Sequence, residues 1–367
     1  MLKKRLFKRI YLSVVVSALS LLAACYGRPA DDLEPVGTSP LACRQTPASN
    51  IAVRWIETAR ENHREKLVGW CKTVGPPVVE LRSDVRSPVL DSLALITWNA
   101  HVGSGEITRV VGALRTGLLT GGEPIEHFVL FLQEVFRAGD EVPLDGPEKY
   151  TTPRTQGIPP SGPRIDIVQT ARRLGLSLFY VPSMRNGGPG SGTTEEDRGN
   201  AILTTIPMED FTAIELPLEY HRRVAVAATI RGISTSGQAW TLRLCSTHLD
   251  HRSGWMRFFT SMGVNRLRQA KALSSALPEP SVAIGGDLNA WSIARMESGV
   301  DYLEDQFPQT IADDGKTTVE ANYRPDRRVD RMFFRLPDSC TGHYGRLDQR
   351  FGSDHWPLLG WISLTCS

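Results

Sequence analysis

The segment Ser281-Val-Ala-Ile-Gly-Gly-Asp287-Leu-Asn289 decides the fold when it is set beside the distant segment Gly352-Ser-Asp354-His355. In the first segment a short apolar run leads into glycine and then into a carboxylate. That order is typical of a buried strand that delivers a polar side chain to the rim of a sheet, where ligands bind. Asp287 and Asn289 stand two residues apart, so both side chains can point the same way. These segments therefore predict a sheet edge that carries reactive groups.

Two further segments have the same form. Leu93-Ala-Leu-Ile-Thr-Trp98 runs into Asn99, and Phe128-Val-Leu-Phe-Leu132 runs into Gln133-Glu134. Because ligands of α/β sheets bind outside the ends of the strands, we expect the polar side chains of all four segments to share one site.

Hydrolysis of a phosphate ester is a reaction that this set of side chains can support. It calls for a hard cation, and carboxylate oxygens are the ligands that Mg²⁺ or Mn²⁺ prefers. Glu134 is the best candidate ligand, and Asp354 is the second. Asp287 and Asn289 are suitably spaced to activate and orient the attacking water. His355 can contact the phosphate or move protons, and it needs a carboxylate to fix its tautomer.

Seven short motifs, taken in order, resemble the endonuclease/exonuclease/phosphatase superfamily, the family of pancreatic-type deoxyribonuclease, abasic-site endonucleases, inositol-polyphosphate phosphatases and neutral sphingomyelinases. Each motif alone is a weak signal, whereas all seven in the family's order are a strong one. The resemblance covers roughly residues 93 to 362. The motifs are Thr97-Trp-Asn99, Leu132-Gln-Glu134-Val, Arg198-Gly-Asn-Ala-Ile-Leu203, Ser246-Thr-His248-Leu, Gly286-Asp287-Leu-Asn289, Val329-Asp330-Arg331 and Ser353-Asp354-His355.

The resemblance implies a four-layer α/β sandwich, with two mixed β-sheets packed face to face and helices outside. It also implies roles for further residues. Asp330 matches the family's carboxylate partner of His355, and His248 matches the position that stabilises the transition state or protonates the leaving group. Asn99 would hold the catalytic groups or a phosphate oxygen.

Structural explanations compete with these roles at single positions. An Asp or Asn after a strand is commonly a turn former or a helix cap. Asp330 could simply pair with a neighbouring arginine. The joint pattern favours the functional interpretation for the main residues. The sequence leaves Arg137, Asn200 and His101 open: each is a candidate for substrate binding, and each is equally explained by a structural role.

The N-terminus predicts export and a lipid anchor. Five basic residues lie between Lys3 and Arg9, and the apolar run from Ile10 to Leu22 follows them. That run is too short to span a membrane, which takes about 20 apolar residues. Leu22-Ala-Ala-Cys25 has the pattern of a bacterial lipoprotein lipobox, so we expect a signal peptide over residues 1–24 and acylation of Cys25. The alternative is an ordinary signal peptide cut near Ala24.

The expected location is therefore the bacterial cell envelope. Tyr26 stands where an aspartate would signal retention in the inner membrane of enterobacteria, so the outer membrane is favoured over the inner one. Export also permits disulfides. Local pairing of Cys43 with Cys71, and of Cys340 with Cys366, is favoured, although spacing does not prove the connectivity. Cys245 lies in an apolar strand and is expected to be a buried thiol.

Charge restricts the substrate only modestly. The whole chain has 42 basic and 40 acidic residues, a formal net charge of +2. Residues 1–24 contain five of the basic residues and no acidic ones, so 37 against 40 remain, a net charge of −3. A dedicated nucleic-acid binder usually carries a basic face. Nucleic acid is compatible with this composition but is not demanded by it.

The chain is expected to have three parts: the signal peptide (1–24), a tether with an N-terminal helical extension (25–90), and the catalytic domain (91–367). Residues 47–70 are predicted to be helical, as are stretches near 107–118, 165–174 and 264–277. About 275 residues in the last part suffice for one large core. The loops 138–163 and 183–199, and the aromatic run 254–259, are candidate specificity elements.

These observations predict a monomeric, Mg²⁺- or Mn²⁺-dependent phosphoesterase. The reaction expected is nuclease-like hydrolysis of a phosphodiester by in-line attack of an activated water. One alternative is a phospholipase C of the sphingomyelinase type, acting on a phospholipid head group, which a lipid anchor makes conceivable. The other is a binding lipoprotein that keeps the fold without catalysis; against it, every principal motif retains its reactive residue.

Overall fold

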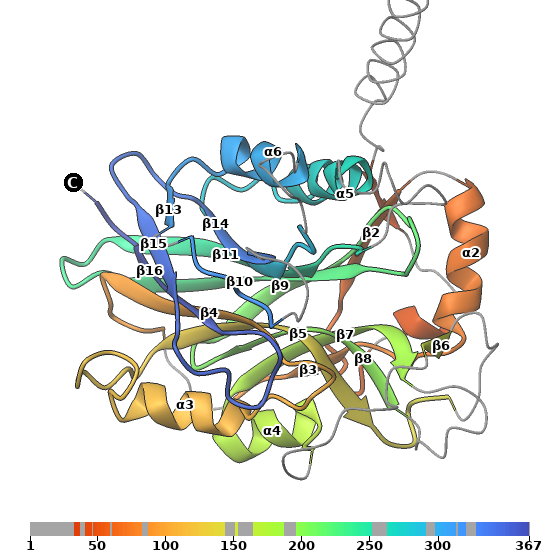
Figure 1. The fold of residues 1–367 in the computed structure, drawn as a ribbon, viewed down its shortest axis with the longest axis horizontal. Helices are drawn as coiled ribbons and strands as arrows, with labels where there is room; N and C mark the ends of the chain where they lie inside the picture. Colours follow the sequence, from red (N-terminus) through yellow and green to blue (C-terminus); the bar gives the residue numbers. More distant parts are fainter. Residues whose placement is uncertain are drawn as a thin grey trace, which may run out of the picture.

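Two mixed β-sheets lie face to face, with helices on their outer faces (Figure 1). The computed structural model describes residues 33–36, 41–45, 47–58, 61–82, 87–143, 151–152, 164–186, 196–251, 263–290, 298–312, 315–320 and 328–366. The layers confirm the predicted four-layer α/β sandwich. Residues 1–24, Cys25 and the aromatic run 254–259 lie outside the described ranges.

The first sheet has seven strands, and most neighbours are antiparallel. Among the described residues, the pairs β2–β9 and β11–β12 run parallel and the other neighbours in this sheet antiparallel. The order is β1 (Leu33–Val36), β2 (Arg54–Thr58), β9 (Met208–Glu215), β10 (Val224–Ile233), β11 (Ala239–His248), β12 (Val282–Asp287) and β14 (Asp330–Arg335).

The second sheet has nine strands. Its parallel pairs are β4–β5, β13–β15 and β6–β7. The order is β13 (Thr310–Ala312), β15 (Gly342–Arg346), β16 (Leu358–Ser363), β4 (Ser92–Asn99), β5 (Phe128–Ala138), β8 (Glu196–Thr204), β7 (Ser177–Asn186) and β3 (Val78–Glu80), with β6 (Thr151–Thr152) beside β7.

Alternating side chains of one strand fill two different cores, as β4 illustrates. Leu93 and Leu95 point between the sheets, whereas Ala94, Ile96 and Trp98 point toward the outer helices. Because side chains alternate across a strand, a strand that is covered on both faces must be apolar throughout. This explains why the segment from residue 93 to 98 is an almost unbroken apolar run.

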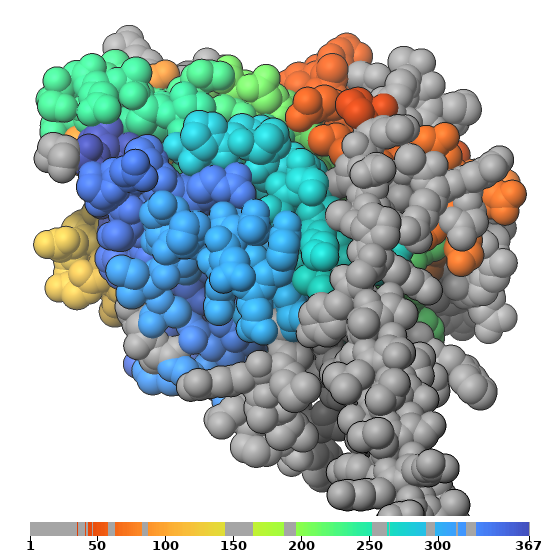
Figure 2. Space-filling view, turned by 90° about the horizontal axis from the view of Figure 1, so that it is seen from above, coloured from red at the N-terminus to blue at the C-terminus, as the bar shows by residue number. Residues whose placement is uncertain are grey.

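The outer helices cover one sheet each. α3 (Ile107–Arg115) and α4 (Ile167–Leu174) pack on the second sheet, and α5 (Val264–Ser275) and α6 (Ser298–Gln306) pack on the first. Figure 2 shows α5 and α6 side by side on that outer face. Asp166 caps α4 by accepting a hydrogen bond from the Gln169 N–H, and Gly175 ends it at φ +62°. These helices confirm the three predicted between residues 107 and 277 to within a few residues.

The predicted helix over residues 47–70 is wrong in its first half. Residues 54–58 form β2, and only Glu61–Cys71 form a helix, α2. Ile51, Val53 and Trp55 face the core between the sheets, while Ile56 packs toward the α5–α6 side. That spacing has a period of two, which a strand requires. β2 and β3 add to the two sheets, so part of the segment predicted as an extension is built into the sandwich.

Two disulfides fasten the ends of the described fold. Cys43, in the short 3₁₀ helix Ala42–Arg44, is bonded to Cys71 at the end of α2, and Cys340 is bonded to Cys366 near the C-terminus. Both predicted pairings are confirmed, as is the buried thiol of Cys245, whose pKa burial raises to about 12. No helix within the described ranges is long and apolar enough to cross a membrane.

Candidate active site

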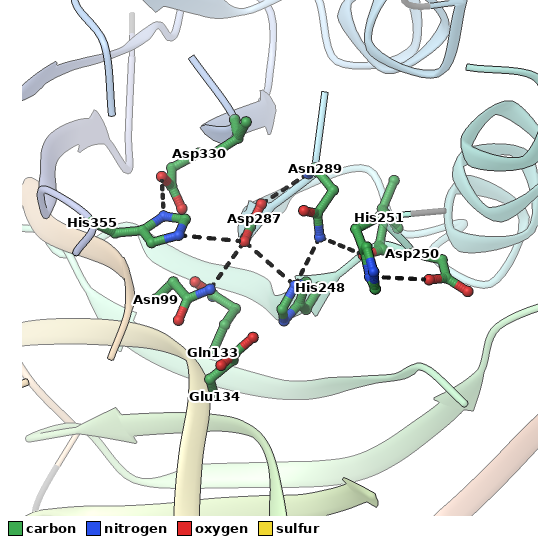
Figure 3. Close-up of polar contacts among 12 residues, drawn as sticks. Asn99, Gln133, Glu134, His248, Asp250, His251, Asp287, Asn289, Asp330 and His355 are labelled. Carbon is green, nitrogen blue, oxygen red and sulfur yellow. Dashed lines mark hydrogen bonds and ion pairs between the residues drawn. The ribbon is translucent and has the colours of Figure 1, made fainter. Parts of the chain in front are cut away.

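Three neighbouring strands of the first sheet bring one histidine and two aspartates side by side. His248 ends β11, Asp287 ends β12, and Asp330 begins β14. In the strand register His248 lies opposite Asp287, and Asp287 lies opposite Asp330. Figure 3 shows the three side chains on the same edge of the sheet. The pairing of these three strands is therefore sufficient to place His248, Asp287 and Asp330 next to one another.

Asp287 is at the centre of a hydrogen-bond network. Its Oδ1 accepts from the backbone N–H of Asn289 at 2.8 Å, and its Oδ2 accepts from the Asn99 Nδ2 at 3.0 Å. The Nε2 atoms of His248 and His355 lie 3.4 and 3.9 Å from the same Oδ2. Asn289 also places its Nδ2 2.9 Å from the His248 Nε2. Five predicted residues are thus in direct or near contact (Figure 3).

His355 is held by Asp330, as the sequence predicted. The Nδ1 of the imidazole lies 2.7 Å from the Asp330 Oδ2, which leaves Nε2 facing Asp287. The backbone around His355 is fixed as well. Its carbonyl accepts from the Trp98 Nε1, and Ser353 accepts from its N–H while donating to the Asn99 carbonyl. Trp98 and Asn99 are therefore hydrogen-bonded to residues 257 and 254 positions away. Residues that only formed local turns would have no reason to meet in this way.

Burial and charge shift the pKa values of this cluster in opposite directions. Burial, together with the nearby charge of Asp330, raises the pKa of Asp287 to about 6. For His355, burial lowers the pKa, but Asp330 and the other carboxylates outweigh it and raise the pKa to about 10. Burial lowers the pKa of His248 well below its usual value. Near neutral pH, Asp287 can accept a proton, His355 is charged and His248 is neutral.

Glu134 reaches the site from a β-bulge inside a strand. β5 does not end at Glu134 as expected; it continues to Ala138, and its register with β8 shifts between Leu132 and Val135. Glu134 has φ +52°, a left-handed conformation that is uncommon for residues other than glycine. Bulges of this kind re-aim side chains beside active sites. Its Oε2 lies 3.8 Å from the Arg198 Nη1.

Asp354 and His101 lie at the rim. The His101 Nδ1 is 3.5 Å from the Asp354 Oδ1, which in turn lies 3.9 Å from the His355 Nε2. The backbone N–H of His101 donates to the Asn99 Oδ1. With φ +46°, His101 is a second residue in the left-handed conformation, after Glu134. Strained backbone of this type is concentrated at functional sites.

Two predicted substrate-binding residues have other contacts. The guanidinium of Arg137 forms a buried salt bridge with Asp197 and donates to the Pro76 carbonyl. These contacts support the structural role of Arg137, and its phosphate contact stays a prediction. Asn200 donates from Nδ2 to the Val224 carbonyl at 2.7 Å and so joins the two sheets. Substrate binding by Asn200 stays a prediction.

Two supporting residues received no specific role from the sequence, although Gln133 stands in the quoted Glu134 motif. Gln133 donates to the Ser246 Oγ across the two sheets, and Thr318 accepts from the backbone N–H groups of Val329 and Asp330. The neighbouring Glu134 motif could have pointed to Gln133. Thr318 has no sequence signal, because it lies in a separate irregular segment.

The donor atoms fit a hard divalent cation. Asp287, Asp330 and His355 each place a possible ligand atom within 4.8 Å of the others, and the Asp354 Oδ1 lies 3.9 Å from the His355 Nε2. Glu134 lies on the Asn99 side of this group in Figure 3. Carboxylate oxygens suit Mg²⁺ and Mn²⁺. Within the described part of the chain, the buried Asp330 Oδ1 accepts no hydrogen bond. Burial and, after it, the charge of Asp330 raise the pKa of Asp287, so its ionised form is disfavoured here. A cation near these groups would offset that charge.

Comparison with known proteins points to one family. The model of the endonuclease/exonuclease/phosphatase family matches residues 96–355, which include every residue of the cluster above. No curated protein matches the chain significantly.

Solved structures resemble the chain at low identity. TDP2 from C. elegans is 16% identical, covers 74% of this chain and 75% of its own, and has a TM-score of 0.40. Beta toxin 275-280 from Staphylococcus aureus is 18% identical over 73% of this chain and 99% of its own, with a TM-score of 0.40. A mannosyl-6-phosphatase from Bacteroides thetaiotaomicron is 10% identical over 74% and 99%, with a TM-score of 0.38.

Proposed function

This chain belongs to the endonuclease/exonuclease/phosphatase family, and from that premise we propose that it is a divalent-metal-dependent phosphoesterase that hydrolyses phosphodiesters. The observation that carries the proposal is the joined network of Asp330, His355 and Asp287. A base with a pKa of about 6 stands beside an imidazolium whose other nitrogen is held by a carboxylate. Such a pair can accept the proton of an attacking water and stabilise the developing negative charge.

Each residue has a task that follows from its contacts. Asp287 accepts the proton of the attacking water, and Asn99 and the Asn289 N–H hold its carboxylate in place. Asp330 fixes the His355 ring, so that Nε2–H faces the phosphate position and stabilises its negative charge. His248, neutral and bonded to Asn289, stands at the other edge near the leaving group.

Glu134 and Asp354 are the residues that would hold Mg²⁺ or Mn²⁺. When bound, the cation supplies neutralisation of charge on the phosphate. Glu134 is buried at the bulge, whereas Asp354 is half-exposed. Of the two proposed ligands, Asp354 is therefore the one nearer to solvent.

Glu134→Gln is expected to lower turnover by at least about a hundredfold at limiting Mg²⁺, because the amide keeps the shape but loses the charge that holds the cation. Glu123→Gln, an exposed glutamate in a loop, is the matched control and should leave turnover unchanged. Unchanged turnover in Glu134→Gln would remove this residue from the site.

The substrate class is decided by assaying the mature protein with Mg²⁺ or Mn²⁺. We propose a nuclease-like activity, so release of nucleotides from DNA or RNA is the expected result. Release of choline phosphate from sphingomyelin would instead support the phospholipase C alternative. If the protein hydrolyses none of these substrates, nor phosphoinositides or a generic phosphodiester, the result would support a binding lipoprotein that keeps the fold without catalysis.

For its location we propose a lipid anchor on Cys25 in the cell envelope, with the outer membrane favoured. The support is the lipobox pattern in residues 22–25. Stable attachment takes two acyl chains, which a diacylated cysteine supplies. Cys25→Ala is therefore expected to abolish incorporation of radiolabelled palmitate and to move the protein out of the membrane fraction. Equal labelling of the variant would defeat the proposal.

A further inference from the structure

A second cluster of side chains that could hold a metal ion lies beside the catalytic residues. Asp250 and His251 follow β11, the strand that carries His248 (Figure 3), and His221 precedes β10. One ligand atom from each lies within 4.8 Å of the others. The reaction described above uses none of the three residues.

The spacing of these atoms is that of ligands around an ion. The Nδ1 atoms of His221 and His251 lie 3.7 and 3.6 Å from the Asp250 Oδ1. These distances are long for hydrogen bonds. By contrast, nitrogen and oxygen ligands at 2.0–2.2 Å from one tetrahedral Zn²⁺ are separated by roughly 3.3–3.6 Å. The two nitrogen–oxygen distances are therefore within a few tenths of an ångström of those around a common ion, and all three atoms lie within 4.8 Å of one another.

The carboxylate of Asp250 is oriented by the backbone. Its Oδ2 accepts from the N–H groups of Tyr220 and His221, both at 2.7 Å, which leaves Oδ1 toward the two imidazoles. The imidazole rings are stacked, with centroids 5.1 Å apart. Asp250 is fully buried, whereas both histidines are partly exposed. This arrangement has an anchored inner ligand and two outer ligands that an ion can reach from solvent.

The surrounding charges favour a metal that binds nitrogen strongly. Two of the three donor atoms are imidazole nitrogens. The charges of Arg223 and Arg198 oppose a cation here. A hard ion such as Mg²⁺ gains too little from imidazole to offset that repulsion, whereas Zn²⁺ binds imidazole well.

We propose that His221, Asp250 and His251 form a second metal site, which takes a borderline divalent ion of the Zn²⁺ class. The ion joins the segment before β10 to the segment after β11, and so it stabilises the position of His248, two residues before Asp250. This site is separate from the Mg²⁺ or Mn²⁺ site proposed at Glu134.

The test uses Co²⁺ as a spectroscopic substitute for Zn²⁺, with the mature protein in excess Mg²⁺. The wild-type protein should bind one equivalent of Co²⁺ with visible d–d bands typical of tetrahedral nitrogen and oxygen ligands, and Zn²⁺ should displace it. His221→Ala and His251→Ala should each weaken Co²⁺ binding at least about tenfold. His343→Ala, which removes an exposed histidine of β15, is the matched control and should bind like the wild type.

Two outcomes overturn the proposal: absence of the bands in the wild-type protein, or equal Co²⁺ binding by the double variant His221→Ala/His251→Ala. Far-UV circular dichroism checks that the variants fold. If the double variant does not fold, the single variant His251→Ala, which changes a partly exposed ring, is measured in its place. Glu134→Gln should retain the bands. Because the measurement needs no substrate, its result is independent of whether the phosphoesterase activity is found.

Discussion

Two buried ionic clusters on this sandwich differ in their net charge. In the first, the two oxygens of Asp197 receive bonds from Arg137, from the Tyr180 hydroxyl and from the Gly75 N–H. In the second, Asp287 and Asp330 lie on adjacent strands with His355 between them, and the Asp330 Oδ1 accepts no hydrogen bond within the described residues. The first cluster is neutral and closed, and the second keeps an excess of negative charge.

The difference separates a structural role from a chemical one. A closed buried salt bridge has no capacity left for a ligand, and breaking it leaves an uncompensated charge. Two neighbouring carboxylates with one imidazole between them are destabilised until a cation or proton arrives; burial and the charge of Asp330 both raise the pKa of Asp287 accordingly. Arg137 follows Glu134 by three residues but belongs to the closed cluster, so proximity in sequence could not decide between its two possible roles.

The largest effect is expected for Asp287→Asn, which should lower kcat by about a thousandfold because it removes the general base. The same change removes a charge that is unfavourable next to Asp330, so the melting temperature of the metal-free protein should not fall. Asp338→Asn, at an exposed aspartate, is the control for both measurements. If Asp287→Asn instead loses stability and keeps its activity, Asp287 has a structural role and is not the general base.

Arg137→Met should have the reverse effect. It leaves Asp197 buried without its cation, so the free energy of unfolding should fall by about 3–5 kcal/mol, measured by denaturant titration. Turnover per folded molecule should stay within about twofold of the wild type. The double variant Arg137→Met/Asp197→Asn should recover part of the lost stability. A selective rise in KM with unchanged stability would instead restore the phosphate-binding role.

Asp330→Asn is expected to lower kcat/KM by about ten- to a hundredfold, as loss of an orienting partner commonly does. It should also move the pH profile. His355 acts when protonated, and loss of Asp330 lowers its pKa from about 10, so the alkaline limb should shift to lower pH. Asp287 acts when deprotonated, and the same loss lowers its raised pKa, so the acidic limb should shift down too. Unmoved limbs in the measured kcat/KM profile would show that Asp330 only supports the fold.

Local patterns were sufficient for much of the fold. The strands at residues 93–98 and 282–287 were predictable because apolar runs that end in polar residues depend only on neighbours in sequence. Residues 51–56 were misassigned as helical, since their short alternation was read together with the true helix that follows. The bulge at Glu134 was not predictable either, because it exists only relative to the register of β8.

By itself, the sequence determined which reactive side chains stand at strand ends, in what order they occur, and that cysteines close in sequence could pair. Only the tertiary structure decided which of them meet. His355 is 25 residues from Asp330, and Asn99 is 188 residues from Asp287, yet each pair is hydrogen-bonded. The physical reason is that hydrogen bonds and pKa shifts depend on distances of a few ångströms across strands, and strand register sets those distances.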